Sequence, residues 1–278
     1  MTVIAQAGPG RAARLADQTT AAGAAPLAPR ARLWPAFAAV YRAQLSRARV
    51  ARIPLLFVAT FQSVGIMVMM RGVVHSGDGE AARAVVAGSS VLVVAFVALN
   101  LLAQYFGRLR ASGGLDHYAT LPVPPAAVVL GAAGAYASFT VPGTLVTAVT
   151  GCVLFHLPLT NLWVLAVVIP LAGAALSGLG AALGLLAARQ EIATLLGQLG
   201  MSAALLLGVL PASHMPAPIG WVRDLLPSTY GVEAFARTFS GTADTDWAAV
   251  AGDLSVCAAV GVVSLAVATW AYRRAACR

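Results

Sequence analysis

Residues 84–107 read AVVAGSSVLVVAFVALNLLAQYFG and carry no charged side chain between Arg83 and Arg108. A helix needs about 20 mainly apolar residues to cross a bilayer, so this stretch is long enough for one crossing. A second uncharged stretch covers the 72 residues from His117 to Ala188, which is long enough for two crossings with a turn between them. The two stretches indicate a membrane protein that crosses the bilayer several times.

The composition of the whole chain agrees with this interpretation. Its 278 residues are 59% hydrophobic and only 10% charged, and 18 basic against 10 acidic side chains give a net charge of +8. Soluble globular proteins contain roughly 45–50% apolar and about 25% charged residues. The chain has too little charge to cover a water-exposed surface, which excludes an ordinary soluble enzyme, a disordered scaffold and a collagen-like chain.

The charged residues divide the chain into six predicted transmembrane helices of an all-α fold. We expect them at about residues 53–71, 84–106, 126–155, 162–187, 192–211 and 247–271. With an even number of crossings both termini lie on one side. That side receives 14 Arg and the other side four, and basic residues favour the cytoplasm. The sequence predicts a multi-pass protein of the cell membrane with both termini cytoplasmic, so its basic charge requires no nucleic-acid partner.

The residues before the first predicted crossing form two different segments. Residues 1–32 are rich in Ala, Pro, Gly and Arg, so we expect a disordered cytosolic tail, with a transit peptide as the alternative. The transmembrane domain then comprises residues 33–278. Aromatic residues recur at helical spacing in its first part, at Trp34, Phe37 and Tyr41. This spacing is typical of an amphipathic helix in the membrane interface over residues 33–50. A continuation of the first crossing is the alternative, but Pro54 favours two separate helices.

Several kinds of active site are excluded or disfavoured by the residue types that the chain contains. All 18 basic residues are Arg, so the chain has no Lys for a phosphate-binding P-loop or a Schiff base. Its cysteines, Cys152, Cys257 and Cys277, have no CxxC spacing, so we expect no disulfide framework and no metal site. The middle of the predicted crossings contains essentially no ionisable residue, which argues against a carboxylate proton relay. We predict that this chain binds no metal or cofactor and has no catalytic residue.

Polar and small residues inside the predicted crossings give weaker indications. Asn100 and Gln104 are four residues apart and share one helix face. They either line a substrate path or hydrogen-bond a neighbouring helix. Gly180 and Gly184 form a GxxxG spacing, which allows another helix to approach closely but does not identify that helix.

The loop after the second predicted crossing is longer than a tight turn needs. Its sequence Gly-Gly-Leu-Asp-His-Tyr-Ala-Thr-Leu-Pro over residues 113–122 mixes charge, glycine and apolar groups. A short helix here would place Leu115, Tyr118 and Leu121 on one side, ready to dock into a groove of another protein. A solvated connector is the alternative.

The region from Pro211 to Asp246, before the last predicted crossing, is too long and too apolar for a simple loop. We expect short helices at Met215–Ile219 and Trp221–Phe239 that dip into the outer leaflet, with an external helical cap as the alternative. Within the second helix, two opposite charges four residues apart form an ion pair: Glu233 and Arg237.

Together these features resemble the permease subunit of ABC-2 type exporters, most closely the daunorubicin-resistance permeases. The resemblance covers residues 33–274 and rests on two patterns besides the six crossings and the N-terminal amphipathic helix. The first is Arg108 followed by residues 113–122. The second is Pro218, Trp221, Leu226-Pro227, Tyr230, Glu233-Ala234, Arg237 and Gly241.

The resemblance implies a homodimer or heterodimer of permeases in the lipid bilayer, bound to ATP-binding subunits that hold the ATP and Mg²⁺. It further implies that the loop after the second crossing contacts the ATP-binding subunit through Arg110, Gly113, Leu115 and Asp116. By the same resemblance, Tyr230 and Glu233 belong to an outer gate, while Asn100 and Gln104 remain candidates for the substrate path.

The function that we predict from the sequence is ATP-driven export of an amphiphilic molecule, such as a drug, a lipid or a lipid-linked glycan. Because the chain has no P-loop lysine, a separate subunit must hydrolyse the ATP. An ion-coupled secondary transporter and a membrane structural partner without transport are the alternatives. A membrane enzyme is disfavoured because four scattered His and few acidic residues form no catalytic cluster.

Overall fold

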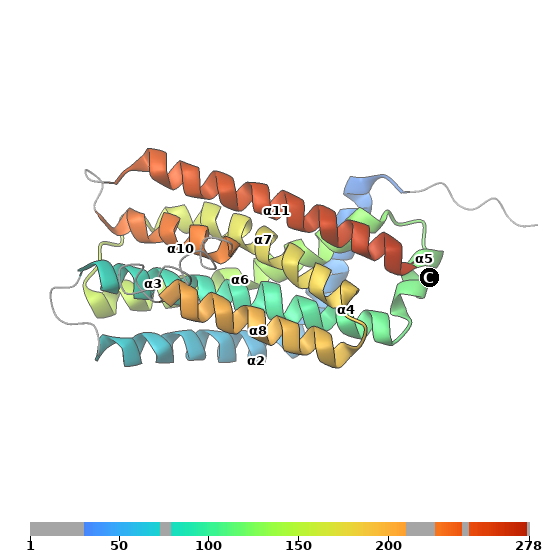
Figure 1. Cartoon of the computed structure of the whole chain (residues 1–278), viewed down its shortest axis with the longest axis horizontal. Coiled ribbons are helices and arrows are strands. Elements are labelled where there is room, and N and C mark those ends of the chain that lie inside the picture. The colour runs from blue at the N-terminus through green and yellow to red at the C-terminus, as the bar shows by residue number, and fades with distance from the viewer. Residues whose placement is uncertain (1–30, 73–78, 210–225, 241–244, 277–278) are drawn as a thin grey trace, which may run out of the picture.

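The computed structural model describes residues 31–72, 79–209, 226–240 and 245–276, and all of their side chains except those of residues 47–53, 55, 119, 209 and 240. Every regular element in these segments is a helix, which confirms the all-α prediction. The long helices lie side by side in one bundle (Figure 1). Helix α5 (Gly114–Thr120) lies at one end, which we call the α5 end, and α10 (Pro227–Arg237) lies toward the other, the α10 end.

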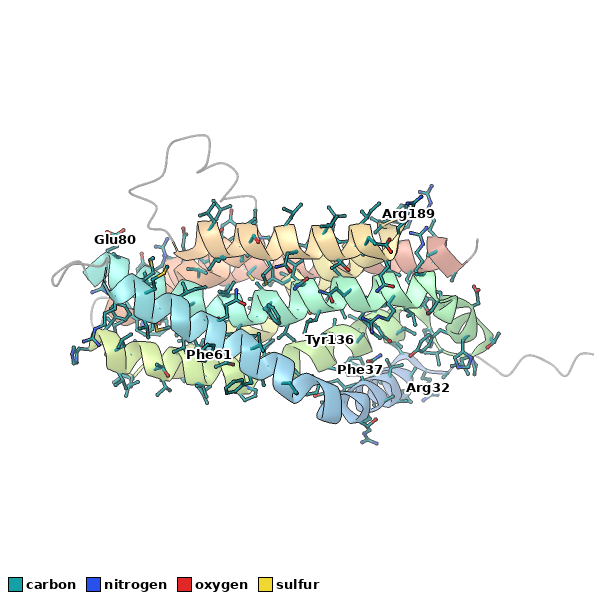
Figure 2. The ribbon with its side chains drawn as sticks, turned by 90° about the horizontal axis from the view of Figure 1, so that it is seen from below. Arg32, Phe37, Phe61, Glu80, Tyr136 and Arg189 are labelled. Carbon is teal, nitrogen blue, oxygen red and sulfur yellow. The ribbon has the colours of Figure 1, made fainter. Side chains whose placement is uncertain are left out.

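Helix α2 runs from Leu33 to Arg71 as one 39-residue helix. The predicted separation into two helices at Pro54 is therefore wrong. A proline removes one backbone hydrogen bond and crowds the preceding turn, which bends a helix without necessarily ending it. Figure 2 shows that α2 changes direction between the part that carries Phe37 and the part that carries Phe61.

The N-terminal part of α2, residues 33–46, is called the α2 arm below. It packs across α6 (Pro125–Phe155), where glycines allow close approach. A Cβ at Gly131 would lie 2.8 Å from the side chain of Val40, and one at Gly134 would touch the rings of Phe37 and Tyr41.

The second predicted crossing is the most buried of the long helices. Helix α3 (Gly79–Val94), the π-helix η1 (Ala95–Leu101) and α4 (Leu102–Ala111) continue one another as a single run over residues 79–111. The predicted crossing at residues 84–106 lies inside this run. No Gly or Pro within η1 marks the change of helical winding, so the π-helix was not predicted.

The other long helices agree with the predicted crossings to within a few residues at most ends. They are α6, α7 (Leu165–Leu186, preceded by a 3-10 turn at Leu162–Val164), α8 (Gln190–Val209) and α11 (Trp247–Ala276). In the described residues, five helical runs are long and apolar enough to cross a bilayer: residues 79–111, 125–155, 162–186, 190–208 and 247–276. The first predicted crossing contains only the shorter apolar segment Leu56–Arg71, so a sixth crossing stays a prediction.

The start of α2 and the end of α11 lie at the same end of the bundle. The Ala31 N–H donates to the Pro122 carbonyl over 2.9 Å, which places the start of α2 beside the loop that follows α5. Helix α11 ends at Ala276 near α5 (Figure 1). Within the described residues, α2 therefore begins and α11 ends at the α5 end of the bundle. The predicted helix at Met215–Ile219 and most of the predicted tail lie outside the described residues.

Candidate coupling site and conformational core

Helix α5 is short and is anchored on the bundle by its own apolar side chain. Gly113 precedes it with φ of 69°, a left-handed conformation that glycine adopts without steric cost. Leu115 is only 3% exposed and belongs to a buried cluster with Phe106 of α4 and Tyr272 of α11. Asp116 remains exposed. The helix therefore presents a polar outer side on a rigid support.

Arg110, at the end of α4, ties this loop to a second turn of the chain. Its Nη1 donates to the carbonyls of Leu185 over 2.6 Å and Ala187 over 2.7 Å. These carbonyls belong to the C-terminal end of α7, where unpaired backbone acceptors and the helix dipole favour a cation. Arg110 therefore joins the end of α4 to the end of α7.

The four residues that the family resemblance placed at the partner contact thus separate into two pairs. Gly113 and Asp116 are exposed. Leu115 and Arg110 are engaged within the chain, so neither offers its side chain freely to another protein. Leu115 packs within this chain, and docking of the short helix onto another protein stays a prediction.

The GxxxG pair in α7 brings two helix backbones into direct contact. A Cβ at Gly180 would collide with the Leu99 carbonyl oxygen, and one at Gly184 with that of Ala103. On the opposite side, Gly200 of α8 approaches Leu99, where a Cβ would lie 2.9 Å from its side chain. The π-helix therefore lies between faces of α7 and α8 that carry glycines at the points of contact.

Amide side chains connect the π-helix to α8. Asn100 is 2% exposed, and its Nδ2 donates to Gln198 Oε1 over 3.4 Å. The Gln104 Nε2 in turn donates to Asn100 Oδ1 over 3.0 Å. The Asn100 contact is a hydrogen bond between helices, one of the two interpretations, whereas the Gln104 contact lies within one helical run. A role in lining a substrate path stays a prediction.

Helix α10 is inserted among the long helices. Its N-terminal part, with Leu226 and Tyr230, packs against a cluster that includes Leu99 of the π-helix. At its other end Phe235 packs with Val85 of α3 and Met67 of α2. A half-length helix buried among long helices favours the interpretation of a helix that dips into the bundle over a plain cap.

Charged residues fasten α10 to α11. The predicted pair between Arg237 and Glu233 is present at 3.8 Å, but Arg237 Nε lies closer to Asp253 Oδ2, at 3.0 Å. Asp253 has only 15% of its side chain exposed. The sequence prediction considered only partners on the same helix and therefore missed the shorter contact. Within the described residues, no three His, Cys, Asp or Glu side chains lie close enough to hold a metal ion.

A comparison with known protein families identifies the family of this chain. The family described as "ABC-2 family transporter protein" matches residues 43–270, a range that includes the π-helix, α5 and α10. The chain belongs to the ABC-2 transporter family. As an ABC-2 permease it is a multi-pass membrane component of an ABC transporter, a class that in general works with an ATP-binding subunit. No curated protein matches the chain.

Proposed function

We propose that this ABC-2 permease is the membrane subunit of an exporter that moves an amphiphilic molecule outward with ATP hydrolysed by a separate subunit. The family match over residues 43–270 carries the proposal. The absence of Lys from the sequence supports it, because a P-loop cannot form without that residue. The exported molecule belongs to the class of drugs, lipids and lipid-linked glycans.

The α5 end faces the cytoplasm in this proposal. Both the start of α2 and the end of α11 lie there, and the Arg-rich segments of the sequence cluster on the same side of the predicted crossings. An ATP-binding subunit then contacts the outer side of α5 through Asp116 and the exposed turn at Gly113. Two permeases, identical or different, assemble with two such subunits.

Movement of the ATP-binding subunit is passed inward through contacts that are already in place. Leu115 fixes α5 to α4 and α11, and Arg110 fixes the end of α4 to the end of α7. Helix α7 in turn packs backbone to backbone on the π-helix, against which the N-terminal part of α10 lies. Closure of the partner therefore favours one of two arrangements of these helices over the other. The coupling is reciprocal, so the arrangement of the permease in turn affects how tightly the partner binds ATP. Tyr230 and Glu233 on α10 serve as the outer gate.

A charge reversal at the proposed contact tests this function. Asp116→Arg is expected to abolish co-purification of the full chain with the ATP-binding subunit that purifies with the wild-type chain, because it reverses the charge at the proposed contact and changes only an exposed side chain of α5. Glu80→Arg makes the same change at the exposed start of α3, toward the α10 end, and is expected to leave the association intact. Normal association of the Asp116 variant would refute the placement of the contact.

A further inference from the structure

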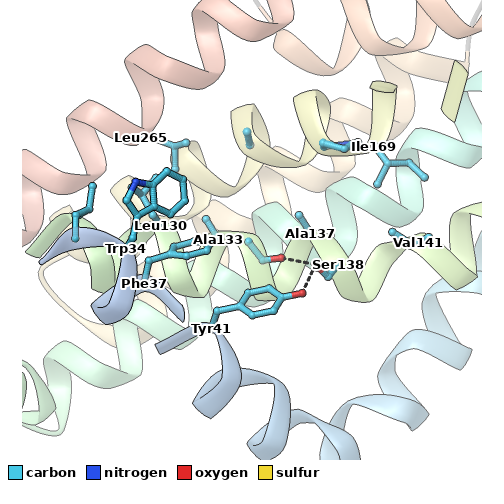
Figure 3. Close-up of a pocket in the computed structure, with 14 residues that line it drawn as sticks. Trp34, Phe37, Tyr41, Leu130, Ala133, Ala137, Ser138, Val141, Ile169 and Leu265 are labelled. Carbon is cyan, nitrogen blue, oxygen red and sulfur yellow. Dashed lines mark hydrogen bonds between the residues drawn. The ribbon is translucent and has the colours of Figure 1, made fainter. Parts of the chain in front are cut away.

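A large groove runs between the α2 arm and the bundle, and no residue of α5 or α10 lines it. Its volume is about 660 Å³. The arm contributes three aromatic side chains, and helices α6, α7 and α11 close the other sides (Figure 3). Three of the residues that α6 contributes are small: Ala133, Gly134 and Ala137. We call this space the arm groove.

The lining of the arm groove is almost entirely hydrocarbon. The rings of Trp34, Phe37 and Tyr41 stand in succession along the arm, with centroids 6.0 and 5.9 Å apart. The lining has one polar spot, where the Tyr41 and Ser138 hydroxyls hydrogen-bond over 2.9 Å (dashed in Figure 3). Small-molecule sites commonly measure 300–1,000 Å³ and combine apolar walls with a few polar groups. The groove therefore fits a long apolar chain with a polar end.

The groove is open to the surroundings of the bundle, and the charged side chains on and just before the arm are all basic. Trp34, at the start of the arm, is 77% exposed. Arg32 precedes the lining residue Leu33, Arg42 follows Tyr41, and both Arg side chains are exposed. The sequence has no Asp or Glu from residue 18 to residue 77, so no carboxylate on α2 neutralises these cations. A negatively charged group is favoured beside the groove.

We propose that the arm groove binds an acyl chain of an anionic membrane phospholipid, with its phosphate held by Arg32 and Arg42. A bilayer supplies both parts of such a ligand at the place where the groove opens. A bound chain lies along α6, between the arm on one side and helices α7 and α11 on the other, so it adds to the contacts that hold the arm on the bundle. The proposal does not depend on the exporter function, because it concerns a resident lipid.

Tryptophan quenching by brominated acyl chains tests the proposal on the full chain in nanodiscs. One variant keeps Trp34 as its only tryptophan and a matched variant keeps Trp270, which is 53% exposed on α11. The other tryptophans in each variant are replaced by Phe. The probe is phosphatidylglycerol with brominated chains, added in increasing mole fraction to unlabelled phosphatidylcholine. Because the Arg274 guanidinium lies 5.4 Å from the Trp270 ring, both tryptophans have a neighbouring cation, and Trp34 has one Arg more than Trp270. Trp34 is therefore expected to reach half-quenching at a mole fraction about fivefold lower than Trp270 does.

Two substitutions separate the acyl chain from the head group. Ala137→Leu fills the groove and is expected to remove the preferential quenching of Trp34, whereas Ala39→Leu, at an exposed position of the arm, retains it. Replacing Arg32 and Arg42 together by Gln is expected to remove the preference for phosphatidylglycerol. Arg71→Gln, at the other end of α2, preserves that preference.

Two results would overturn the proposal. Equal quenching of Trp34 and Trp270 at every mole fraction would show ordinary contact with surrounding lipid. Preferential quenching of Trp34 by brominated phosphatidylcholine, without phosphatidylglycerol, would assign the groove to a neutral amphiphile. The comparison of the two tryptophans needs no groove variant, so it remains decisive if Ala137→Leu fails to fold.

Discussion

Adding one methyl group at Gly180 should destabilise the permease far more than adding one at Gly252. The two glycines lie in transmembrane helices, α7 and α11, but have opposite surroundings. A Cβ at Gly180 would meet backbone atoms on the π-helix run, with the Ala98 carbonyl oxygen at 2.9 Å and the Leu99 Cα at 3.0 Å. A Cβ at Gly252 would meet nothing within 4 Å.

The expected magnitude follows from two opposing effects. Inserting a methyl group into a packed core costs about 1–3 kcal/mol when the neighbours cannot move aside. The contacted atoms at Gly180 are backbone, so they yield less than the end of a side chain. Alanine also favours a helix over glycine by up to about 1 kcal/mol, and this gain applies at both positions. Because the helix-propensity gain is the same in both variants, it cancels when their free energies of unfolding are subtracted. The difference that remains is the packing strain at Gly180, about 1–3 kcal/mol.

The assay is the free energy of unfolding of Gly180→Ala and Gly252→Ala, each measured by SDS titration in mixed micelles with helix content followed by circular dichroism. Gly252→Ala is expected to unfold at the wild-type SDS fraction or above it, and Gly180→Ala below it. Equal midpoints for the two variants would refute the direct backbone contact between α7 and the π-helix.

Three further predictions concern the other contacts of the core. Leu115→Ala should lower the free energy of unfolding by about 2–4 kcal/mol, because a buried leucine leaves a cavity, which thermal unfolding of the purified protein measures. A double-mutant cycle on Asn100 and Gln198 should give a coupling energy of about 0.6 kcal/mol, the size of a hydrogen bond between membrane helices. Arg237→Gln should cost about 1–3 kcal/mol, because it leaves the mostly buried Asp253 without its cation, and the loss is read as a lower midpoint in the same titration.

Each of these predictions has a result that contradicts it. A Leu115 variant as stable as the exposed Asp116→Arg variant would show that α5 is not anchored by the buried leucine. If the changes in unfolding free energy at Asn100 and Gln198 were additive, the result would contradict a hydrogen bond between the two side chains. An Arg237 variant with wild-type stability would mean that α10 is held by apolar packing alone.

The positions of the long helices were predictable because uncharged stretches bounded by Arg leave few alternatives in a bilayer. The GxxxG spacing of Gly180 and Gly184 also predicted a close helix contact, although the partner helix became known only from the structure. The bend at Pro54 was misjudged as a break. A proline has the same local effect whether the helix bends or ends there, so the sequence around Pro54 does not distinguish the two outcomes. The packing of the arm on α6 decides between them.

The contacts at the α5 end were less predictable for a physical reason. A leucine in a short loop helix has the same sequence signature whether its groove lies in a partner or in its own chain, so burial of Leu115 could not be foreseen. The family resemblance placed Arg110 at the contact with the ATP-binding subunit, and sequence spacing could not show that the carbonyls at the end of α7 lie within its reach. The pairing of Arg237 with Asp253 likewise joins residues on different helices.

The central claim is that this permease obtains its energy from a separate ATP-binding subunit docked at the α5 end. The most direct measurement is ATP hydrolysis in proteoliposomes that contain the permease alone, the ATP-binding subunit that purifies with it alone, or both. We expect no hydrolysis by the permease alone and stimulated hydrolysis when both are present, with the stimulation lost in Asp116→Arg and kept in Glu80→Arg. Hydrolysis by the permease alone, or stimulation unaffected by Asp116→Arg, would contradict the claim.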